Sequence, residues 1–315
     1  MILQWNQFSP QKSRYLFLEF HHLIKEHDPL GYKICLPYLS LVTLIINNSD
    51  TMRDINYRVL PLFLELQMGN ILSKDKKTIG PNNNRSGRFA IYYAPTPFSE
   101  LHSLGSTWLG RDSATGKIIE QPSISGIASE RLSELTKSAR HYGFHATLKP
   151  PFQLKHGTSL TLLKHALRQV CEDTSPFYVK LDVSTLGKFF ALMLSKPNPK
   201  MQSLAEIMVR EIDAFREHLT KEELAIRRSK GLTPSQDKNL IKWGYPYVFS
   251  EFRFHMTLTA KIQLTKEQAI IHDAIQRHFS KSLKKRIKIE YVCLFHQTNR
   301  QAPFLLVDQF KLGLK

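Results

Sequence analysis

Two short segments of the chain share one pattern of apolar and polar positions. Their sequences are YGFHATL at residues 142–148 and FRFHMTL at residues 252–258, which agree at Phe, His, Thr and Leu in register. Apolar residues alternate with polar ones in both segments, which is the period of a strand with one face on a core. The pattern therefore predicts two equivalent half-buried strands that lie 110 residues apart in the chain.

The elements that follow these strands occur in the same order. After the first strand, the apolar spacing predicts a helix over 159–172 and strands over 177–186 and 188–194. The second copy begins with a strand over 251–262, which is followed by a helix over 266–279 and strands over 286–295 and 304–310. Strand, helix, strand, strand thus occurs twice. The sequence therefore predicts two related lobes.

Turn and capping residues define the remaining elements. Thr265, with Gln268 three residues later, has the pattern of a helix N-cap with a capping box. The other predicted elements are a strand over 88–94 ended by Pro95 and Pro97, a turn over 112–116, a helix over 128–137, and a long helical stretch over 199–229 followed by a loop with Gly231 and Pro234.

The composition changes near residues 73–88, which are rich in Asn, Gly, Ser and Lys and nearly free of large apolar residues. Such a segment is typical of a linker. We therefore expect an N-terminal extension of unknown role over 1–87 and a two-lobed domain over 88–315. The apolar run over 34–46 contains Pro37 and is shorter than a membrane-spanning helix requires, so we interpret it as a buried or interfacial segment.

Charge points to an anionic ligand. The 315 residues contain 44 Lys and Arg against 27 Asp and Glu, for a net charge of +17 and a pI near 9.7. Three widely spaced cysteines form neither a disulfide framework nor a zinc pattern, and the first 30 residues lack a secretory signal. We expect a cytoplasmic monomer without membrane association.

The polar faces of the two equivalent strands carry the candidate chemistry. His145 and Thr147 share one such face, and His255 and Thr257 share the other. Histidine serves as general base or acid near neutral pH, and a Thr hydroxyl can donate to a phosphoryl oxygen. The paired motifs therefore predict a shared site that cleaves phosphate esters without metal. Further substrate-binding candidates beside the motifs or among the aromatic residues are Tyr142, Lys149, Tyr247 and Arg253.

Structural alternatives exist for several of these residues. Lys149 and Arg253 are equally typical of solvated strand positions, and Tyr142 and Tyr247 of the core or of a cleft wall. His141 and His145 have the spacing of a helical zinc motif, but Gly143 and the strict alternation favour a strand, so we expect no metal. His156 and His165 are interpreted as surface histidines.

Longer segments around the motifs resemble a known superfamily. These segments are RFAIYYAPTPFSELHSLGSTWLGRD at 88–112, HYGFHATLKPPF at 141–152 and YPYVFSEFRFHMTLT at 245–259. They resemble the two-histidine (2H) phosphoesterases, which include 2′-5′ RNA ligases and cyclic phosphodiesterases. The flanks are most similar to a phosphonate-metabolism protein branch of that superfamily. The resemblance covers about residues 88–312.

The resemblance implies an α+β fold with two pseudo-twofold lobes, in which two antiparallel sheets face each other across a cleft with helices outside. His145, Thr147, His255 and Thr257 match the motif positions, with His255 as the base and His145 as the acid. The implied substrate is a small cyclic or diester sugar phosphate from phosphonate breakdown, such as a phosphoribosyl cyclic phosphate, and no cofactor is implied. An RNA-end-processing or RNA-binding protein of the same fold remains the alternative, because charge and aromatic residues also suit RNA.

Overall fold

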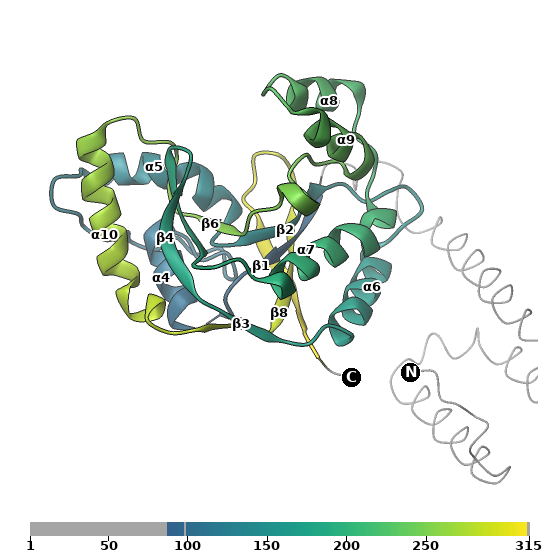
Figure 1. The fold of residues 1–315 in the computed structure, drawn as a ribbon, viewed down its shortest axis with the longest axis horizontal. Coiled ribbons are helices and arrows are strands. Elements are labelled where there is room, and N and C mark those ends of the chain that lie inside the picture. Colours follow the sequence, from purple (N-terminus) through teal and green to yellow (C-terminus); the bar gives the residue numbers. More distant parts are fainter. Residues whose placement is uncertain (1–86, 98, 314–315) are drawn as a thin grey trace, which may run out of the picture. The chain divides into compact units, whose positions relative to one another are not determined.

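The computed structural model describes residues 87–97 and 99–313 of the chain. Seven strands form one antiparallel sheet in the order β4-β5-β6-β2-β1-β8-β9, and β3 pairs with β7 in a second, small sheet (Figure 1). The strands are β1 (Arg88–Tyr93), β2 (Ala146–Phe152), β3 (Phe177–Val179), β4 (Leu181–Leu186), β5 (Phe189–Leu194), β6 (His255–Thr257), β7 (Ile287–Ile289), β8 (Tyr291–Gln297) and β9 (Leu305–Lys311).

A pseudo-twofold relation connects the two halves of the domain. Strands β2 and β6 pair at Ala146 and Met256, the middle residues of the two His-x-Thr motifs. The small sheet pairs Tyr178 with Lys288 at its centre. Both pairs join residues 110 positions apart, which is the spacing of the sequence repeat. The repeat predicted from the sequence is therefore a repeat of structure.

The two repeats exchange strands. Strand β2 of the first repeat pairs with β1, which in turn pairs with β8 of the second repeat, so β2 lies in the same half of the sheet as β8 and β9. In the other half, β6 of the second repeat pairs with β5 of the first. The expected α+β fold with antiparallel strands in two lobes is confirmed. We expected two separate sheets, but the structure joins them into one at the Ala146–Met256 pair.

Helices cover each half of the sheet. In the half with β4, β5 and β6, α10 packs on β4 and on α4, and α4 packs on α5; in the other half, α6 packs on β9 and α7 on β2. The bounds of these helices are α4 (Glu100–Leu109), α5 (Ser129–Tyr142), α6 (Leu160–Glu172), α7 (Pro199–Glu211) and α10 (Thr265–Leu283). Helix α4 was not among the predicted elements.

The helical stretch predicted over 199–229 is interrupted. After α7 the chain forms a short 3-10 turn, η3 (Asp213–Phe215), and then two short helices, α8 (Lys221–Arg228) and α9 (Pro234–Trp243). Arg228 donates to both carboxylate oxygens of Asp237 and so holds α8 against α9. No residue of α8 is buried, and the α8–α9 hairpin projects from the rest of the domain (Figure 1).

Three sequence predictions about element ends were wrong. The first motif strand begins at Ala146, because Tyr142 is the last residue of α5. The second contains only His255–Thr257 and follows a 3-10 turn, η4 (Phe249–Glu251). Helix α10 has Leu264 as its N-cap, so there is no capping box, and the Gln268 amide donates instead to the carbonyl of Ile262 at 2.8 Å.

The apolar faces predicted for the two motifs form part of the core. Buried in the first are Phe144, Ala146 and Leu148, and in the second Phe254, Met256 and Leu258. All of these side chains belong to one continuous hydrophobic cluster that extends into both halves of the sheet. Burial of one face directs the alternate His and Thr side chains to the opposite face.

Several predictions concern residues outside the described part of the chain. The extension over 1–87, apart from Gly87, and the apolar run over 34–46 lie there, so the proposed domain boundary remains a prediction. Among the described residues, no helix has the length and apolar character needed to cross a bilayer.

Candidate active site

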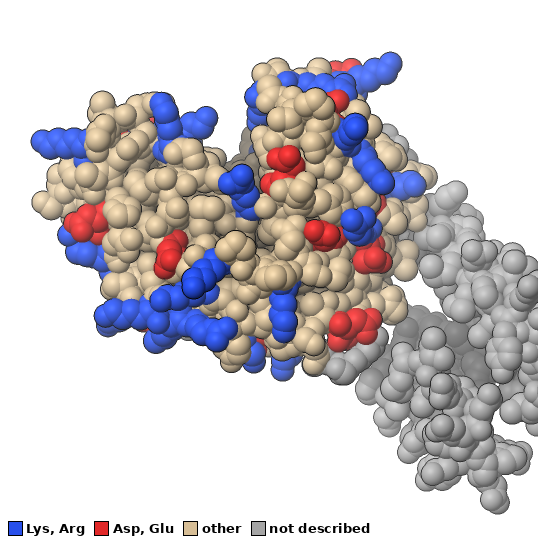
Figure 2. All heavy atoms as spheres, in the orientation of Figure 1, with Lys and Arg blue, Asp and Glu red and all other residues tan. Residues whose placement is uncertain are grey.

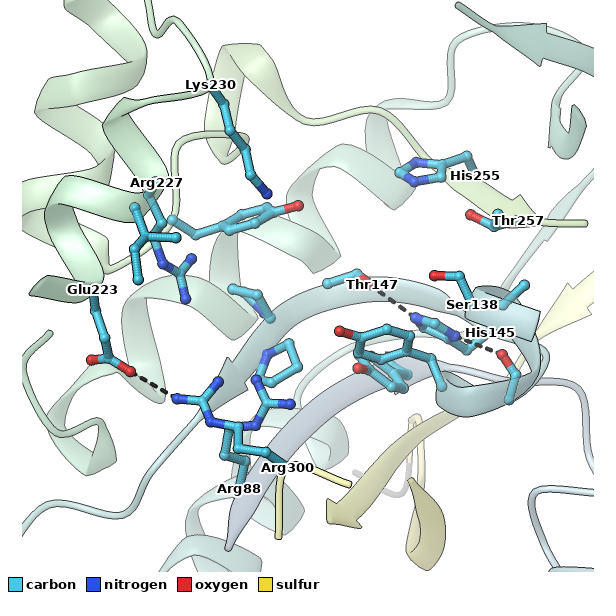
Figure 3. A pocket seen from close by; sticks show the side chains of 18 residues that line it. Arg88, Ser138, His145, Thr147, Glu223, Arg227, Lys230, His255, Thr257 and Arg300 are labelled. Atoms are coloured by element: carbon cyan, nitrogen blue, oxygen red, sulfur yellow. Dashed lines mark hydrogen bonds and ion pairs between the residues drawn. The ribbon is translucent and has the colours of Figure 1, made fainter. Parts of the chain in front are cut away.

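A cavity of about 540 Å³ lies where the two motif strands meet. His145 and Thr147 reach it from the start of β2, and His255 and Thr257 reach it from β6 (Figure 3). Figure 2 shows the surface hollowed between the part that carries α5 and α10 and the part that carries α8 and α9. The four residues predicted from the repeated motif therefore line one cavity.

The two histidines are held in the same way. His145 Nδ1 lies 2.9 Å from the carbonyl oxygen of Gly143, and His255 Nδ1 lies 2.7 Å from that of Arg253. A carbonyl oxygen only accepts, so Nδ1 carries the proton in each neutral imidazole and Nε2 has a free lone pair. For His145 that Nε2 lies 3.2 Å from the Thr147 hydroxyl. Each motif thus presents an unprotonated Nε2.

Neighbouring strands fix the positions of the motif side chains. Thr147 is opposite Tyr92 of β1, while His255 and Thr257 are opposite Met193 and Ala191 of β5. The His145 ring stacks on Tyr92, with ring centroids 3.8 Å apart. Because backbone pairing and ring packing hold these groups in place, the site is organised before any ligand binds.

Burial lowers the pKa of both imidazoles. For His145 the pKa falls to about 4, chiefly because burial disfavours the imidazolium; the Gly143 carbonyl opposes this change and His255 adds to it. Burial also lowers the pKa of His255, against the opposing effect of the Arg253 carbonyl. Both histidines are therefore neutral in the free protein at pH 7 and suited to accept a proton.

The other end of the cavity is lined by cationic side chains that sequence reasoning missed. They are Arg88 of β1, Arg227 and Lys230 at the end of α8, and Arg300 of the β8–β9 loop (Figure 3). Their positions in the chain share no spacing or motif. The excess of positive charge in the sequence predicted an anionic ligand but indicated none of these four residues.

Lys149 does not reach the cavity, so its assignment as a substrate-binding residue is wrong. Its side chain is 1% exposed, and its ammonium group pairs with Asp213 at 2.9 Å and donates to the carbonyl of Val209 at 3.1 Å. A bulge in β2 is the cause. Tyr92 is opposite Thr147 and Ile91 is opposite Lys149, so one extra residue shifts the alternation and places Lys149 on the core face.

Two further assignments also need correction. Arg253 is exposed and does not line the cavity; its contribution to the site is the carbonyl that holds His255. Tyr247 is 44% exposed and lies outside the cavity lining, whereas Tyr245 lines it. The Tyr247 ring packs edge-on against Tyr245, with centroids 5.5 Å apart. Tyr142, the fourth candidate, does line the cavity.

His141 has a different environment from His145. It lies in the last turn of α5, and its Nε2 is 2.9 Å from the side-chain amide nitrogen of Gln297. No cluster of three or more His, Cys, Asp or Glu side chains is arranged to hold a metal ion between residues 87 and 313, residue 98 aside. Helix α5 ends at Tyr142, so His141 and His145 do not share a helix face, as the helical zinc spacing would require.

Comparison with known proteins places the chain beside two curated relatives, both named "Ribose 1,5-bisphosphate phosphokinase PhnN". The protein from Janthinobacterium sp. (strain Marseille) is 36% identical over 222 residues, which are 69% of this chain and 49% of that protein. The one from Laribacter hongkongensis (strain HLHK9) is 31% identical over 219 residues, 70% of this chain and 50% of that protein. The chain spans about half the length of these relatives.

Two solved structures show distant similarity. One, described as the crystal structure of a phosphoesterase, has 10% identity and a TM-score of 0.32, covering 72% of this chain and 98% of that one. The other, Escherichia coli LigT complexed with NADP+, has 12% identity and the same TM-score of 0.32, covering 74% and 99%. At these values neither carries an argument about function.

A family model also matches the chain. It covers residues 147–305, just over half of the 315-residue chain. The matched segment begins at Thr147 of the first motif and contains all of the second, together with α8, α9 and Arg300. The chain therefore belongs to the family described as "Protein of unknown function (DUF1045)".

Proposed function

We propose that this protein is a 2H-type phosphoesterase that hydrolyses a cyclic phosphodiester of a small sugar phosphate without a metal ion. One observation carries the proposal: two imidazoles, each fixed by a carbonyl at Nδ1, line one cavity together with two Thr hydroxyls. The volume of about 540 Å³ suits a small molecule. The name of the curated relatives adds support for a ribose phosphate.

The reaction uses one histidine as base and the other as acid. Water gives a proton to Nε2 of the base as its oxygen bonds to phosphorus, while the ester oxygen leaves and takes a proton from Nε2 of the acid. The family resemblance gives these roles to His255 and His145 respectively. Since the pKa of His145 is about 4 in the free protein, the bound phosphate anion has to raise it before His145 can serve as the acid.

The two threonines suit charge stabilisation. In the free protein the Thr147 hydroxyl lies 3.2 Å from Nε2 of His145. When a bound phosphodiester occupies the position beside Nε2, the Thr147 hydroxyl no longer donates to Nε2. It can then donate a hydrogen bond to a non-bridging phosphoryl oxygen. Thr257 occupies the equivalent position beside His255. Donors placed where charge develops lower the barrier to phosphoryl transfer.

The kinase activity named for the curated relatives is not part of this proposal. This sequence has no G-x-x-x-x-G-K-[ST] motif, the loop with which P-loop kinases hold nucleotide phosphates. The chain also matches only about half of each relative, so their named activity does not transfer with the similarity.

An RNA-directed role is the second candidate, and one surface favours it. Basic side chains cluster around the end of α10 and β7 (Figure 2). Between these two elements, the guanidinium carbon of Arg286 lies 5.6 Å from the ring centroid of the exposed Tyr178. The exposed basic residues there are Lys281, Lys284, Lys285, Arg286 and Lys288. This surface lies outside the cavity lining. Steep loss of activity with salt would support RNA, whereas a small substrate predicts a weak dependence.

The proposal is tested by assaying ribose 1,2-cyclic phosphate and a 2′,3′-cyclic nucleotide in EDTA, with products identified by 31P NMR. We expect ring opening that is lost in His145→Ala and His255→Ala. Absence of hydrolysis of every cyclic phosphate tried, by folded protein, would reject it.

A leaving-group experiment assigns the roles. A phosphodiester with a p-nitrophenolate leaving group needs little acid catalysis because the phenolate leaves unprotonated. The variant that lacks the acid should recover most of its activity on this substrate, whereas the variant that lacks the base should not. We expect recovery in His145→Ala. Recovery in His255→Ala instead would reverse the two roles.

A further inference from the structure

The cavity has two chemically different ends. The motif residues occupy one end, and the guanidinium groups of Arg88, Arg227 and Arg300 occupy the other (Figure 3). These three arginines come from β1, from α8 and from the β8–β9 loop, so the fold brings together side chains far apart in the chain. The Lys230 ammonium group extends into the same space from the end of α8.

Each guanidinium group is held in position by protein. The Arg88 side chain donates to Gln297 Oε1 from Nε at 2.8 Å, and Arg227 Nη1 donates to the carbonyl of Gly244 at 3.2 Å. Arg300 Nη2 pairs with Glu223 Oε1 at 2.8 Å. A guanidinium has five N–H donors, so each arginine keeps donors for a ligand after these contacts.

Positive charge at this end is not balanced. Of the residues that the structure describes, four cationic side chains and one carboxylate line the cavity; the carboxylate, Glu223, already pairs with Arg300. Burial, and after it the charge of Arg300, lowers the pKa of Arg88; burial also lowers the pKa of Arg227, where the charge of Glu223 opposes the change and that of Arg300 adds to it. The exposed Arg300 thus repels the half-buried Arg88 and Arg227, and an anion bound among the three guanidinium groups would relieve that repulsion.

We propose that this end of the cavity binds a phosphomonoester dianion carried by the substrate at a position away from the phosphodiester. The inference rests on the proposed function and narrows it. The substrate class becomes a small sugar with a cyclic phosphodiester at one end and a phosphate group at the other. A phosphate has three terminal oxygens, and planar guanidinium groups match them with paired hydrogen bonds.

The binding site is tested without catalysis. In the His145→Ala, His255→Ala double variant, calorimetry at pH 7.5 measures binding of ribose 5-phosphate, with ribose and inorganic phosphate as comparisons. We expect ribose 5-phosphate to bind and ribose not to bind. Arg88→Gln, Arg227→Gln and Arg300→Gln should each weaken binding about tenfold or more. Arg277→Gln, an exposed arginine of α10 outside the cavity, should not change it.

Glu223→Gln provides a test in which binding should become tighter, whereas the arginine variants should weaken it. The variant removes the single carboxylate but keeps an acceptor for the capping box that Glu223 forms with Thr220. Binding of ribose 5-phosphate should become tighter, a result that a damaged fold does not produce. Unchanged or weaker binding in Glu223→Gln, or equal affinity in the arginine variants and in Arg277→Gln, would overturn the proposed subsite.

Kinetics separate this inference from the proposed function. In the wild-type protein, kcat/KM should be at least tenfold higher for ribose 1,2-cyclic phosphate with a 5-phosphate than without it, and Arg300→Gln should remove the preference. If both compounds are hydrolysed equally, the subsite is wrong and the proposed function stands. If neither is hydrolysed but ribose 5-phosphate binds in an arginine-dependent manner, the subsite stands and the proposed function is wrong.

Discussion

The two histidines owe their common geometry to a backbone feature of each motif. In both, the carbonyl two residues before the histidine accepts a hydrogen bond from Nδ1–H, so Nε2 is the ring nitrogen left to take part in proton transfer. The repeat in the sequence was sufficient to predict the four motif residues. It did not predict the tautomer or the lowered pKa of His145, because these depend on the chain path before the strand and on Tyr92 from β1.

Replacing either histidine should remove one proton-transfer step. We expect His145→Ala and His255→Ala each to lower kcat about a hundredfold or more. Thr147→Ala and Thr257→Ala should lose about tenfold, as expected for one hydrogen bond. The measurement is kcat on a cyclic phosphate, with thermal unfolding as the control for folding. A histidine variant with wild-type kcat would show that the residue has no catalytic role.

The half-buried His145 should also make the protein sensitive to acid. Its folded pKa of about 4 lies below the unfolded value of 6.5, so its stabilising effect is present above pH 6.5 and is lost as pH falls toward 4. The full effect corresponds to roughly 3 kcal/mol. His145→Gln should therefore lose less unfolding free energy than wild type between pH 7 and pH 4.5, measured with urea. An NMR titration of His145 with a midpoint near 6.5 would contradict this account.

In strand β2, the alternation of apolar and polar residues predicts which face a side chain occupies only as far as Thr147. The alternation places His145 and Thr147 correctly, but a bulge before Lys149 moves that residue to the other face. There Lys149 and Arg216 both pair with Asp213 and tie β2 to the η3 turn. A bulge depends on pairing with a distant strand, so the local pattern of residues 142–152 does not reveal it.

This network predicts a separation of stability from catalysis. Asp213→Ala leaves the buried ammonium group of Lys149 unpaired and should lower the free energy of unfolding by roughly 3 kcal/mol. Lys149→Met should change kcat/KM less than threefold, because Lys149 does not reach the cavity. Urea unfolding and steady-state kinetics provide the two measurements, with the exposed pair variant Asp273→Ala as the control. A hundredfold loss of kcat/KM in folded Lys149→Met would show that Lys149 takes part in substrate binding or catalysis.

The α8–α9 hairpin is the element that sequence reasoning resolved least well. The continuous helical pattern over 199–229 concealed the break at the η3 turn, where Asp213 pairs with Arg216. That break directs α8 toward the cavity and brings Arg227 and Lys230 into its lining. Side chains that converge through tertiary structure from three elements leave no pattern in one sequence, so this end of the cavity was not predicted.

At the scale of the whole molecule, the repeat explains why both motifs are needed for one cavity. Each repeat supplies strands to the half of the sheet that contains the other repeat's motif strand. Neither lobe therefore forms its sheet from its own repeat alone. Strand β1 lies outside the matched family segment, yet it pairs with both β2 and β8 and so belongs to the same sheet.

Truncation tests the predicted boundary. Among the described residues, the elements that line the cavity begin at β1, and we therefore expect deletion of residues 1–84 to leave a soluble, active protein. Deletion of residues 1–94 removes β1, leaves β2 and β8 without their shared partner, and should prevent folding. Solubility, circular dichroism and kcat measure the outcome. Aggregation or loss of turnover after the shorter deletion would show that the N-terminal segment is needed.

In the proposed mechanism, two imidazoles perform the hydrolysis without a metal ion. The most direct measurement is the rate of cyclic phosphodiester hydrolysis in excess EDTA by the wild-type protein and by the His145→Ala, His255→Ala double variant, prepared in parallel. The account predicts full activity for the wild type in EDTA and at least a thousandfold loss in the folded double variant. Activity that EDTA abolishes and one divalent ion restores, or a double variant as active as wild type, would contradict it.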